Sequence, residues 1–437
     1  MHKQFPKAKL SIERDYNVII PLLEPYAFAQ ITSLDLSRPW MEPERPYTYN
    51  SLKVDLTQMP NLTHLTVNPH IKPEILALTK IPSIKFPSNY PVTKRLLTQL
   101  TDLRELNLDP NLSSDDLSSL PITSLSLNGE TPLSLETFRS LKLTELTTSS
   151  ENLNLLADEI IQTKYTILTT LALTLREHHP IWFKPISKMT CLKKLTLDCA
   201  ESFPDEKCLI NLTNLTYLRI YTDVDSVHIP HLPRLETFIL YRYRLLLQDI
   251  PLEFPSCPLD NLTHLKIIGY KIKLKNHLVP NLTSLDYNQH EPSESKLSEL
   301  KRLTKLTIIN NEAKSKLIDI TSLNSLVSLV IGGGYYHSCP MSHANIMFAQ
   351  GSDNIVNHTL ETLTITGNEI RGINDHLLVG FPNLRVVSLR CCVPELTSSC
   401  FERLPNLSLL KIHPSNTLDT KSISLLRARG VIIKYCL

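Results

Sequence analysis

The stretch NLTHLTV, residues 61–67, decides how this chain folds, because its pattern of apolar residues returns along almost the whole length. It recurs nearly unchanged as NLTHLKI at residues 261–267. Both begin with the hexad L-x-x-L-x-φ, where φ is aliphatic. Successive side chains of a β-strand face opposite ways, so the fourth and sixth positions of the hexad point to the same side. One such strand cannot bury its apolar face alone, and neighbouring copies must therefore stack.

Seventeen copies of the hexad follow one another through the 437 residues. The first begins at Ile31 and the last at Leu407, a mean spacing of about 23.5 residues, which lies inside the range of about 20–29 residues for one strand and its return. Two weaker copies lie at the ends. AKLSI places Leu10 and Ile12 at strand positions, and GVIIKY places Val431 and Ile433 there. The count then reaches about nineteen repeats.

These hexads resemble those of the leucine-rich repeat superfamily, whose consensus continues with an Asn or Cys three residues after the hexad. Several copies keep that residue: Asn111, Asn311, Asn368 and Cys392. The resemblance implies an α/β leucine-rich repeat solenoid, with a curved parallel β-sheet of about 17–19 repeats and mixed short helices and turns on the convex side. It also implies a single leucine-rich repeat domain over residues 1–437.

Three intervals between hexads are longer than the others. We expect irregular insertions near residues 38–60, 241–258 and 332–357. Insertions in a repeat array form loops and often mark the binding side, although a tolerated surface loop is an equal alternative.

Most returns between strands are too short for more than a turn or two of helix. Residues 16–28, 152–162 and 343–350 look helical. The C-terminal stretch SISLLRARGVIIKYCL, residues 422–437, predicts a helix followed by a closing strand.

Composition limits the compartment and the partners. The formal net charge of +2 gives no field that would attract nucleic acid or membranes. Nine cysteines, an odd number with none in the first 190 residues, argue against a disulfide framework and favour a reducing compartment. The N-terminus lacks the apolar core of a signal peptide, and no apolar run reaches the length of about 18 residues that a membrane span needs. We expect a cytoplasmic, monomeric protein.

The sequence carries no recognised catalytic motif. GxSxG, HExxH, GxxxxGK[ST] and GxGxxG are all absent. His337, Cys339 and His343 share one long return, but a metal site there would need a fourth ligand in view. We therefore expect no enzyme, no cofactor and no bound metal.

Asparagine often precedes the hexad and creates N-x-S/T sequons, such as Asn61-Leu62-Thr63. One interpretation is N-glycosylation of a secreted receptor. The other is that a turn asparagine and a strand threonine fall in this register because the repeat places them there. Without a signal peptide we favour the second interpretation.

The third and fifth residues of each hexad, and the residue directly after it, face the concave side of the predicted sheet. We call the residue after the hexad the seventh position. Most residues at these three positions are small and polar. The middle of the chain differs, because it places there Tyr217, Arg219, Tyr221, Ile239, Tyr241, His264, Lys266 and Ile268, with Tyr243 and Tyr270 just beyond. Parallel strands lie about 4.8 Å apart, so these residues predict one continuous patch. Tyr and Arg are enriched in binding hot spots, but aromatic residues also simply favour strands.

Charge on the concave face is uneven. Acidic residues occupy it in the first third of the chain, namely Asp35, Glu105, Asp109 and Glu145. Basic residues occupy it near the end, namely Arg390, Lys411 and His413. The basic stretch suits an acidic partner, although we favour a solvated basic face.

The sequence therefore predicts a non-catalytic module that binds a protein partner through its concave face, with no nucleic acid and no membrane involved. Two alternatives stay open: the substrate-recognition part of an F-box/leucine-rich repeat ubiquitin ligase adaptor, and a pathogen effector that acts on a host protein. A receptor ectodomain is a third alternative from another class. The fold serves many roles, so it does not choose among them.

Overall fold

The structure is a computed structural model in which part of the chain is described. The described residues are 8–11, 29–36, 56–67, 76, 80–87, 90, 92–108, 117–127, 134–149, 167–175, 183–199, 206–224, 227–242, 251–272, 274–289, 297–310, 316–318, 320, 322–333, 344–348, 357–371, 374–393, 396–416 and 418–436. They fall into two compact units, Met1–Asp198 and Cys199–Leu437. The expected single domain over residues 1–437 stays a prediction.

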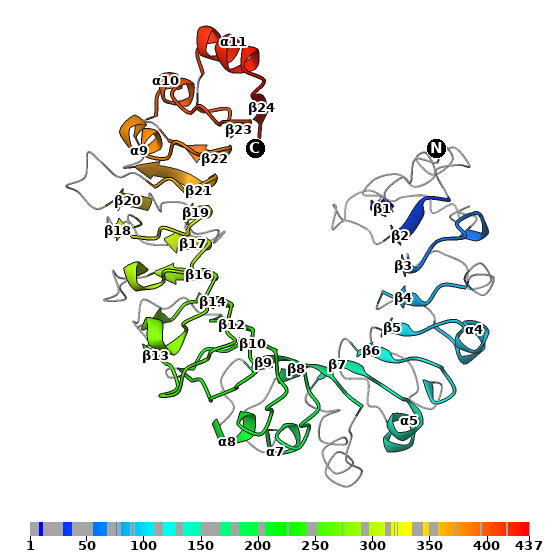
Figure 1. Cartoon of the computed structure of the whole chain (residues 1–437). Coiled ribbons are helices and arrows are strands. Elements are labelled where there is room, and N and C mark those ends of the chain that lie inside the picture. The colour runs from blue at the N-terminus through cyan, green and yellow to red at the C-terminus, as the bar shows by residue number, and fades with distance from the viewer. Residues whose placement is uncertain are drawn as a thin grey trace, which may run out of the picture. The chain divides into compact units, whose positions relative to one another are not determined.

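The first unit is a ladder of short parallel strands. Its strands are β1 (Ala8–Ser11), β2 (Ile31–Asp35), β3 (His64–Thr66), β4 (Ser83–Lys85), β5 (Glu105–Leu108), β6 (Ser124–Leu127), β7 (Glu145–Ser149), β8 (Thr170–Leu175) and β9 (Lys194–Cys199). From β1 to β8 each strand pairs in parallel with the next one along the chain. Every hexad of this half therefore forms a strand beside the strand of the preceding repeat (Figure 1).

The second unit continues the same arrangement. Its strands of the main sheet are β10 (Tyr217–Tyr221), β12 (Thr237–Tyr241), β14 (His264–Ile268), β16 (Ser284–Gln289), β17 (Lys305–Asn310), β19 (Ser328–Gly333), β21 (Thr362–Arg371), β22 (Val386–Cys392), β23 (Leu409–Ile412) and β24 (Ile432–Tyr435). They pair in parallel in this order. The seventeen hexads and both weaker copies thus correspond to strands, which confirms the predicted fold class.

The core lies where the hexad pattern places it. In the copy that begins at Ile31, that residue and Leu34 are 3% and 1% exposed, and Leu36 is fully buried. In the copy that begins at Leu262, Leu265 is 2% exposed and Ile267 is fully buried. The intervening third and fifth positions are half-buried or exposed in both copies. The alternation confirms that the first, fourth and sixth positions form the core while the others face away from it.

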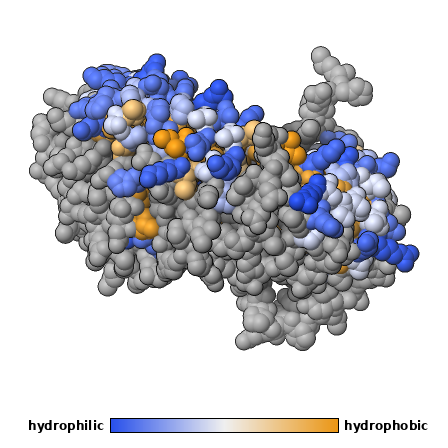
Figure 2. All heavy atoms as spheres, turned by 90° about the horizontal axis from the view of Figure 1, so that it is seen from below, coloured by the Kyte–Doolittle hydropathy of each residue, from blue (hydrophilic) through white to orange (hydrophobic). Residues whose placement is uncertain are grey.

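Short helices make up part of the outer side. They are α4 (Lys94–Gln99), α5 (Leu135–Ser140), α7 (Phe183–Ile186), α8 (Glu206–Leu209), α9 (Asp375–Val379), α10 (Ser398–Glu402) and α11 (Thr420–Ala428), with the 3-10 turns η2 (Leu56–Gln58), η5 (Asn276–Leu278) and η6 (Leu297–Glu299). Within each unit they lie on the side opposite the strands (Figure 1). Figure 2 shows that described apolar side chains on the visible face form only small, separate groups among hydrophilic ones.

Strands also form on the outer side of the second unit, which the sequence did not predict. β11 (Val227–His228), β13 (Pro251–Glu253) and β15 (Lys271–Ile272) make a parallel ribbon. The expected helix at 343–350 was wrong, because β20 (Ala344–Phe348) is a strand that pairs with β18 (Lys316–Ile318) and with β21. An apolar run this short does not decide between helix and strand, and the neighbouring outer strands supply hydrogen bonds that favour the strand.

The C-terminal end follows the predicted order of helix and strand. The side chain of Asp419 caps α11 by accepting a hydrogen bond from Ser422 N at 2.7 Å. Hydrogen bonds to the carboxylate lower the pKa of Asp419 to about 2, and the bond from the Ser398 hydroxyl has the largest effect. The predicted register of the last strand was wrong by two residues, since Ile433 pairs with Leu410 and Tyr435 with Ile412. Tyr435 is 57% exposed because β24 has no neighbour on its far side among the described residues.

Parts of the three predicted insertions lie outside the described residues, namely 37–55, 243–250, 334–343 and 349–356. The expected helices at 16–28 and 152–162 lie outside them as well. The second insertion contributes β13, and the third contributes β20.

We predict that Leu265→Ala lowers the free energy of unfolding by about 2–5 kcal/mol, because it leaves a cavity at a fourth position. Chemical denaturation measures the change. His264→Ala, which alters the exposed neighbour in the same strand, should cost under about 1 kcal/mol. A loss below about 1 kcal/mol for Leu265→Ala would mean that the side chain does not belong to the core.

Candidate functional site

The predicted surface residues lie in three rows across β10, β12 and β14. The row of third positions joins Tyr217, Thr237 and His264, and the row of fifth positions joins Arg219, Ile239 and Lys266. The row of seventh positions joins Tyr221, Tyr241 and Ile268. The strands are in register, so all eight predicted residues share one face of the second unit, and Thr237 is the ninth member that the sequence analysis left out.

Two tyrosines form the centre of this surface. The rings of Tyr221 and Tyr241 stack with centroids 4.9 Å apart and an interplanar angle of 11°. The Cζ atom of Arg219 lies 4.7 Å from the Tyr221 centroid and 5.4 Å from the Tyr241 centroid. The Nζ atom of Lys266 lies 5.3 Å from the Tyr241 centroid. We call Tyr217, Arg219, Tyr221, Tyr241 and Lys266 the tyrosine cluster; its two cations favour the π-faces of the stacked rings.

The cluster is held in place before any partner arrives. Arg219 Nη2 donates a hydrogen bond to the Tyr221 hydroxyl, in addition to its contact with the rings. All five side chains of the cluster are half-buried, so each keeps part of its surface available. Arg219 Nε is buried and has no hydrogen-bond partner within the described part of the chain. Folding therefore leaves one N–H donor of this guanidinium unsatisfied, which costs free energy. Packing of the core does not require this cost, because Arg219 lies on the opposite face of the strand.

His264 is oriented by the residue before it. Its Nδ1 lies 2.8 Å from the Thr263 hydroxyl, and that hydroxyl donates to the Glu236 carbonyl oxygen at 3.2 Å. The contact between Nδ1 and the Thr263 hydroxyl fixes the orientation of the His264 ring.

Two predicted members are less exposed than expected. Ile268 is only 5% exposed, so it supports Tyr241, its register partner, and offers little open surface. Tyr270 is 1% exposed and belongs to the core, where its hydroxyl donates to the carbonyl oxygens of Thr222 and Val224 at 3.2 and 3.3 Å. Gly269 has φ of 89°, a left-handed conformation that ends the strand alternation before Tyr270. Tyr243 lies outside the described residues.

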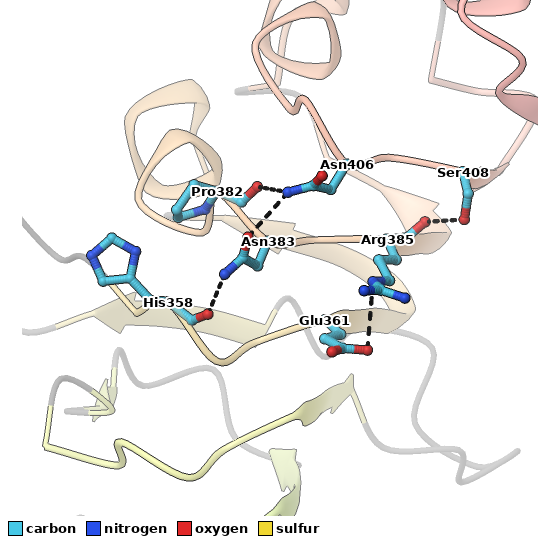
Figure 3. A network of polar contacts seen from close by, with 7 residues as sticks. All are labelled: His358, Glu361, Pro382, Asn383, Arg385, Asn406 and Ser408. Atoms are coloured by element: carbon cyan, nitrogen blue, oxygen red, sulfur yellow. Dashed lines mark hydrogen bonds and ion pairs between the residues drawn. The ribbon is translucent and has the colours of Figure 1, made fainter.

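The asparagine before the hexad has a structural role that the sequence analysis did not identify. Its side-chain Nδ2 donates to a main-chain carbonyl of the preceding repeat. The pairs are Asn61 to Ala29 (2.7 Å), Asn261 to Pro233 (2.6 Å), Asn281 to Asp260 (2.7 Å), Asn383 to His358 (2.5 Å) and Asn406 to Pro382 (3.2 Å). Figure 3 shows the last two pairs.

A second ladder uses the hydroxyl at the second hexad position. Thr263 Oγ1 and Thr263 N donate to the same carbonyl oxygen, that of Glu236, at 3.2 and 2.9 Å. Thr63, Thr144, Thr169, Thr283, Thr304 and Ser408 repeat this contact with the preceding repeat. The Ser408 bond to the Arg385 carbonyl is visible in Figure 3, beside the ion pair of Arg385 and Glu361 at 3.8 Å.

The two ladders account for the sequons. Asparagine and threonine stand two residues apart because each donates to the repeat before it. A glycan would be attached at the asparagine Nδ2, the atom that already makes these hydrogen bonds. The geometry favours the structural interpretation of the sequons over glycosylation.

The described residues offer little reactive chemistry. No group of three or more His, Cys, Asp or Glu side chains suited to a metal ion occurs among them, and His337, Cys339 and His343 lie outside them. Burial, aided by the adjacent Cys392, raises the pKa of Cys391 to about 12, and burial also raises the pKa of Cys400. Both thiols stay protonated at neutral pH, so they are poor nucleophiles. No described helix has the length and apolar character to cross a membrane.

Strand register, core positions and ladders together define the fold of a leucine-rich repeat solenoid, which confirms the predicted fold. The chain is similar in structure to several solved proteins. A leucine-rich repeat protein of Leptospira interrogans is 17% identical, with a TM-score of 0.43 over 98% of this chain and 100% of that one. The structure of the TLR13–ssRNA13 complex is 15% identical, with a TM-score of 0.50 over 93% of this chain and 68% of that one.

An internalin, InlF of Listeria monocytogenes, is also similar, at 18% identity and a TM-score of 0.40 over 75% of this chain and 85% of that one. No protein-family model matches the chain. No curated protein matches it either. At these identities the likeness shows the fold alone, so the function has to be argued from the surface.

We predict that Asn261→Ala lowers the free energy of unfolding by about 0.5–1.5 kcal/mol, because one bond of the asparagine ladder is lost. Asn261→Asp should cost more, because it places a carboxylate oxygen against the Pro233 carbonyl oxygen. Urea titration measures both changes. The adjacent exposed substitution Asp260→Asn serves as the control and should change stability by less than about 0.5 kcal/mol. If Asn261→Asp is as stable as the parent, the ladder contributes nothing.

Proposed function

We propose that this chain is a non-catalytic protein-interaction module whose partner contacts the tyrosine cluster on the open face of the second unit. The observation that carries the proposal is the stacked pair Tyr221 and Tyr241, with Arg219 and Lys266 within 5.5 Å of its rings, on a half-buried surface. The proposal agrees with the sequence-based prediction that the concave face is the binding side.

The residue types support a contact surface. Tyrosine supplies a large rigid area with few rotatable bonds, so little entropy is lost when a partner orders it. Arginine supplies a planar set of donors that suits carboxylates and main-chain carbonyls. Tyr and Arg are also the types that dominate binding energy in measured interfaces.

Packing does not explain why these residues stand there. Some fifth and seventh positions elsewhere in the second unit carry small hydroxylic side chains, for example Thr307, Thr364 and Thr366, and the sheet forms in the same register through them. Large aromatic and basic side chains at fifth and seventh positions are therefore not a requirement of the repeat. A role in binding a partner explains the large side chains of the tyrosine cluster, which folding does not explain.

The class of partner is part of the proposal. Among the similar structures, the one named for the TLR13–ssRNA13 complex holds RNA, so the fold alone does not choose between protein and nucleic acid. We favour protein because the faces of Tyr221 and Tyr241 are already engaged by each other and by two cations, whereas single-stranded nucleic acid needs free aromatic faces on which to stack. The adaptor and effector alternatives stay predictions.

A monomer in the cytoplasm is the remaining part of the proposal. The eight described cysteines are free thiols, and Cys199, Cys391 and Cys400 are buried. We predict that mass spectrometry of the native protein under non-reducing conditions finds all nine cysteines reduced and no glycan. A stoichiometric disulfide would contradict the proposed cytoplasmic location.

For the binding site, we predict that Tyr221→Ala weakens the affinity for the partner by about 2 kcal/mol, roughly thirty-fold. The partner is obtained by affinity capture from native lysate, and its affinity for purified variants is then measured. Loss of the stacked ring should cost the fold only about 1 kcal/mol, which the thermal midpoint reports.

Two variants make this experiment specific. Tyr221→Phe keeps the stacked ring and removes the hydroxyl, so it separates the contact area from the hydrogen bond with Arg219. Tyr435→Ala makes the same change at a tyrosine that is 57% exposed on β24, away from the cluster, and should leave binding unchanged. Equal affinity of Tyr221→Ala and the parent would show that the tyrosines are structural.

A further inference from the structure

The open face of the second unit is strongly basic. Its described third, fifth and seventh positions carry Arg219, Lys266, Lys305, Arg390, Lys411 and Lys434 against the single acid Asp286. The same positions of the first unit carry the acids Asp35, Glu105, Glu145 and Asp198 against Lys9, Lys85 and Lys194. The net charge of the whole chain is close to zero, yet the open face of the second unit is basic.

The basic residues form a path that leads away from the tyrosine cluster. Lys266 and Lys434 are separated by seven consecutive strand pairings, or about 34 Å at the usual strand spacing. Lys305, Arg390 and Lys434 are exposed, and Lys411 is half-buried. Glu361, the acid just before β21, is already paired with Arg385 at 3.8 Å. Asp286, the acid on the path itself, is the register partner of Lys266, so it offsets charge only at the end nearest the tyrosine cluster.

The spacing of the charges indicates what kind of anion fits. Between Lys305 on β17 and Arg390 on β22, the strands β19 and β21 place neutral Ser, Val and Thr side chains on the open face. This neutral gap covers three strand steps, about 14 Å. A nucleic acid carries a phosphate at every nucleotide and gains its affinity from phosphates that are neutralised. A nucleic acid laid along the path would have phosphates over the gap with no basic side chain on β19 or β21 to neutralise them.

A polypeptide suits the same path. Its carboxylates can be separated by neutral residues, and about twelve extended residues span roughly 40 Å. Carboxylates would meet Lys266 and Lys305 at one end, and Arg390, Lys411 and Lys434 at the other. The hydroxyls of the intervening Ser and Thr side chains can hydrogen-bond to its main chain.

We propose that the open face from β14 to β24 binds an extended acidic polypeptide segment of the partner, with Asp or Glu side chains paired to the basic path and the tyrosine cluster at one end. The proposal rests on the proposed function and adds the chemistry of the partner and the extent of the contact.

The test is a selection of random displayed peptides of about twelve residues, the length that spans the path, on the full chain. Selected peptides should be rich in Asp and Glu, and raised salt should weaken their binding because exposed charges are screened. Fluorescence anisotropy then compares a selected peptide with an oligouridine RNA of similar length on the same protein.

Matched charge-reversal variants locate the site. Lys305→Glu with Lys411→Glu should weaken binding of the selected peptide by about ten-fold or more, and the milder Lys305→Gln with Lys411→Gln should give a smaller loss. The control, Lys301→Glu with Lys421→Glu, makes the same change of charge in the same two repeats but at exposed positions off the open face, in the turn before β17 and the first turn of α11. It should leave binding unchanged.

Three outcomes would overturn the inference: neutral or basic selected peptides, tighter binding of the RNA, or equal losses from the test and control variants. If selected peptides are neutral but lose affinity with Tyr221→Ala, the proposed function stands and only the acidic segment is refuted. If peptides of any charge bind independently of Tyr221, both proposals fail.

Discussion

The burial of the first, fourth and sixth side chains between neighbouring strands is the interaction on which the rest of this structure depends. A single hexad has no partner for its inward face, so each strand is stable only beside the strand of the next repeat. Leu265 and Ile267 show the result, since both are almost fully buried although their strand has only five residues. Long-range order here comes from repetition of one short-range contact.

That constraint leaves the opposite side of each strand free to vary. Side chains at third, fifth and seventh positions make no demand on the core, which is why Ser, Thr, Tyr, Arg and Lys all occur there within one sheet. The tyrosine cluster and the basic path therefore carry information about a partner in a way that the leucines do not. In a repeat protein, a residue that departs from its own repeat deserves a functional explanation.

The sequence predicted well those features that recur in every repeat. Strand positions and the register of β10, β12 and β14 followed from the hexad, so the face shared by Tyr217, Arg219 and Tyr241 was predictable. The failures lie where the repeat ends. Tyr270 was misplaced because the left-handed Gly269 breaks the alternation, and Ala344–Phe348 forms a strand because outer strands pair with it. The asparagine ladder was missed because its acceptors are main-chain atoms, which every residue shares.

The ladders have a direction. In each asparagine or hydroxyl bond described above, the donor belongs to the later repeat and the acceptor carbonyl to the earlier one. A ribosome releases the chain from its N-terminus, and N-terminal parts fold first during synthesis. Each emerging repeat of this chain therefore meets acceptors that are already in place, and it can dock as soon as its own hexad, with the preceding asparagine, has left the exit tunnel.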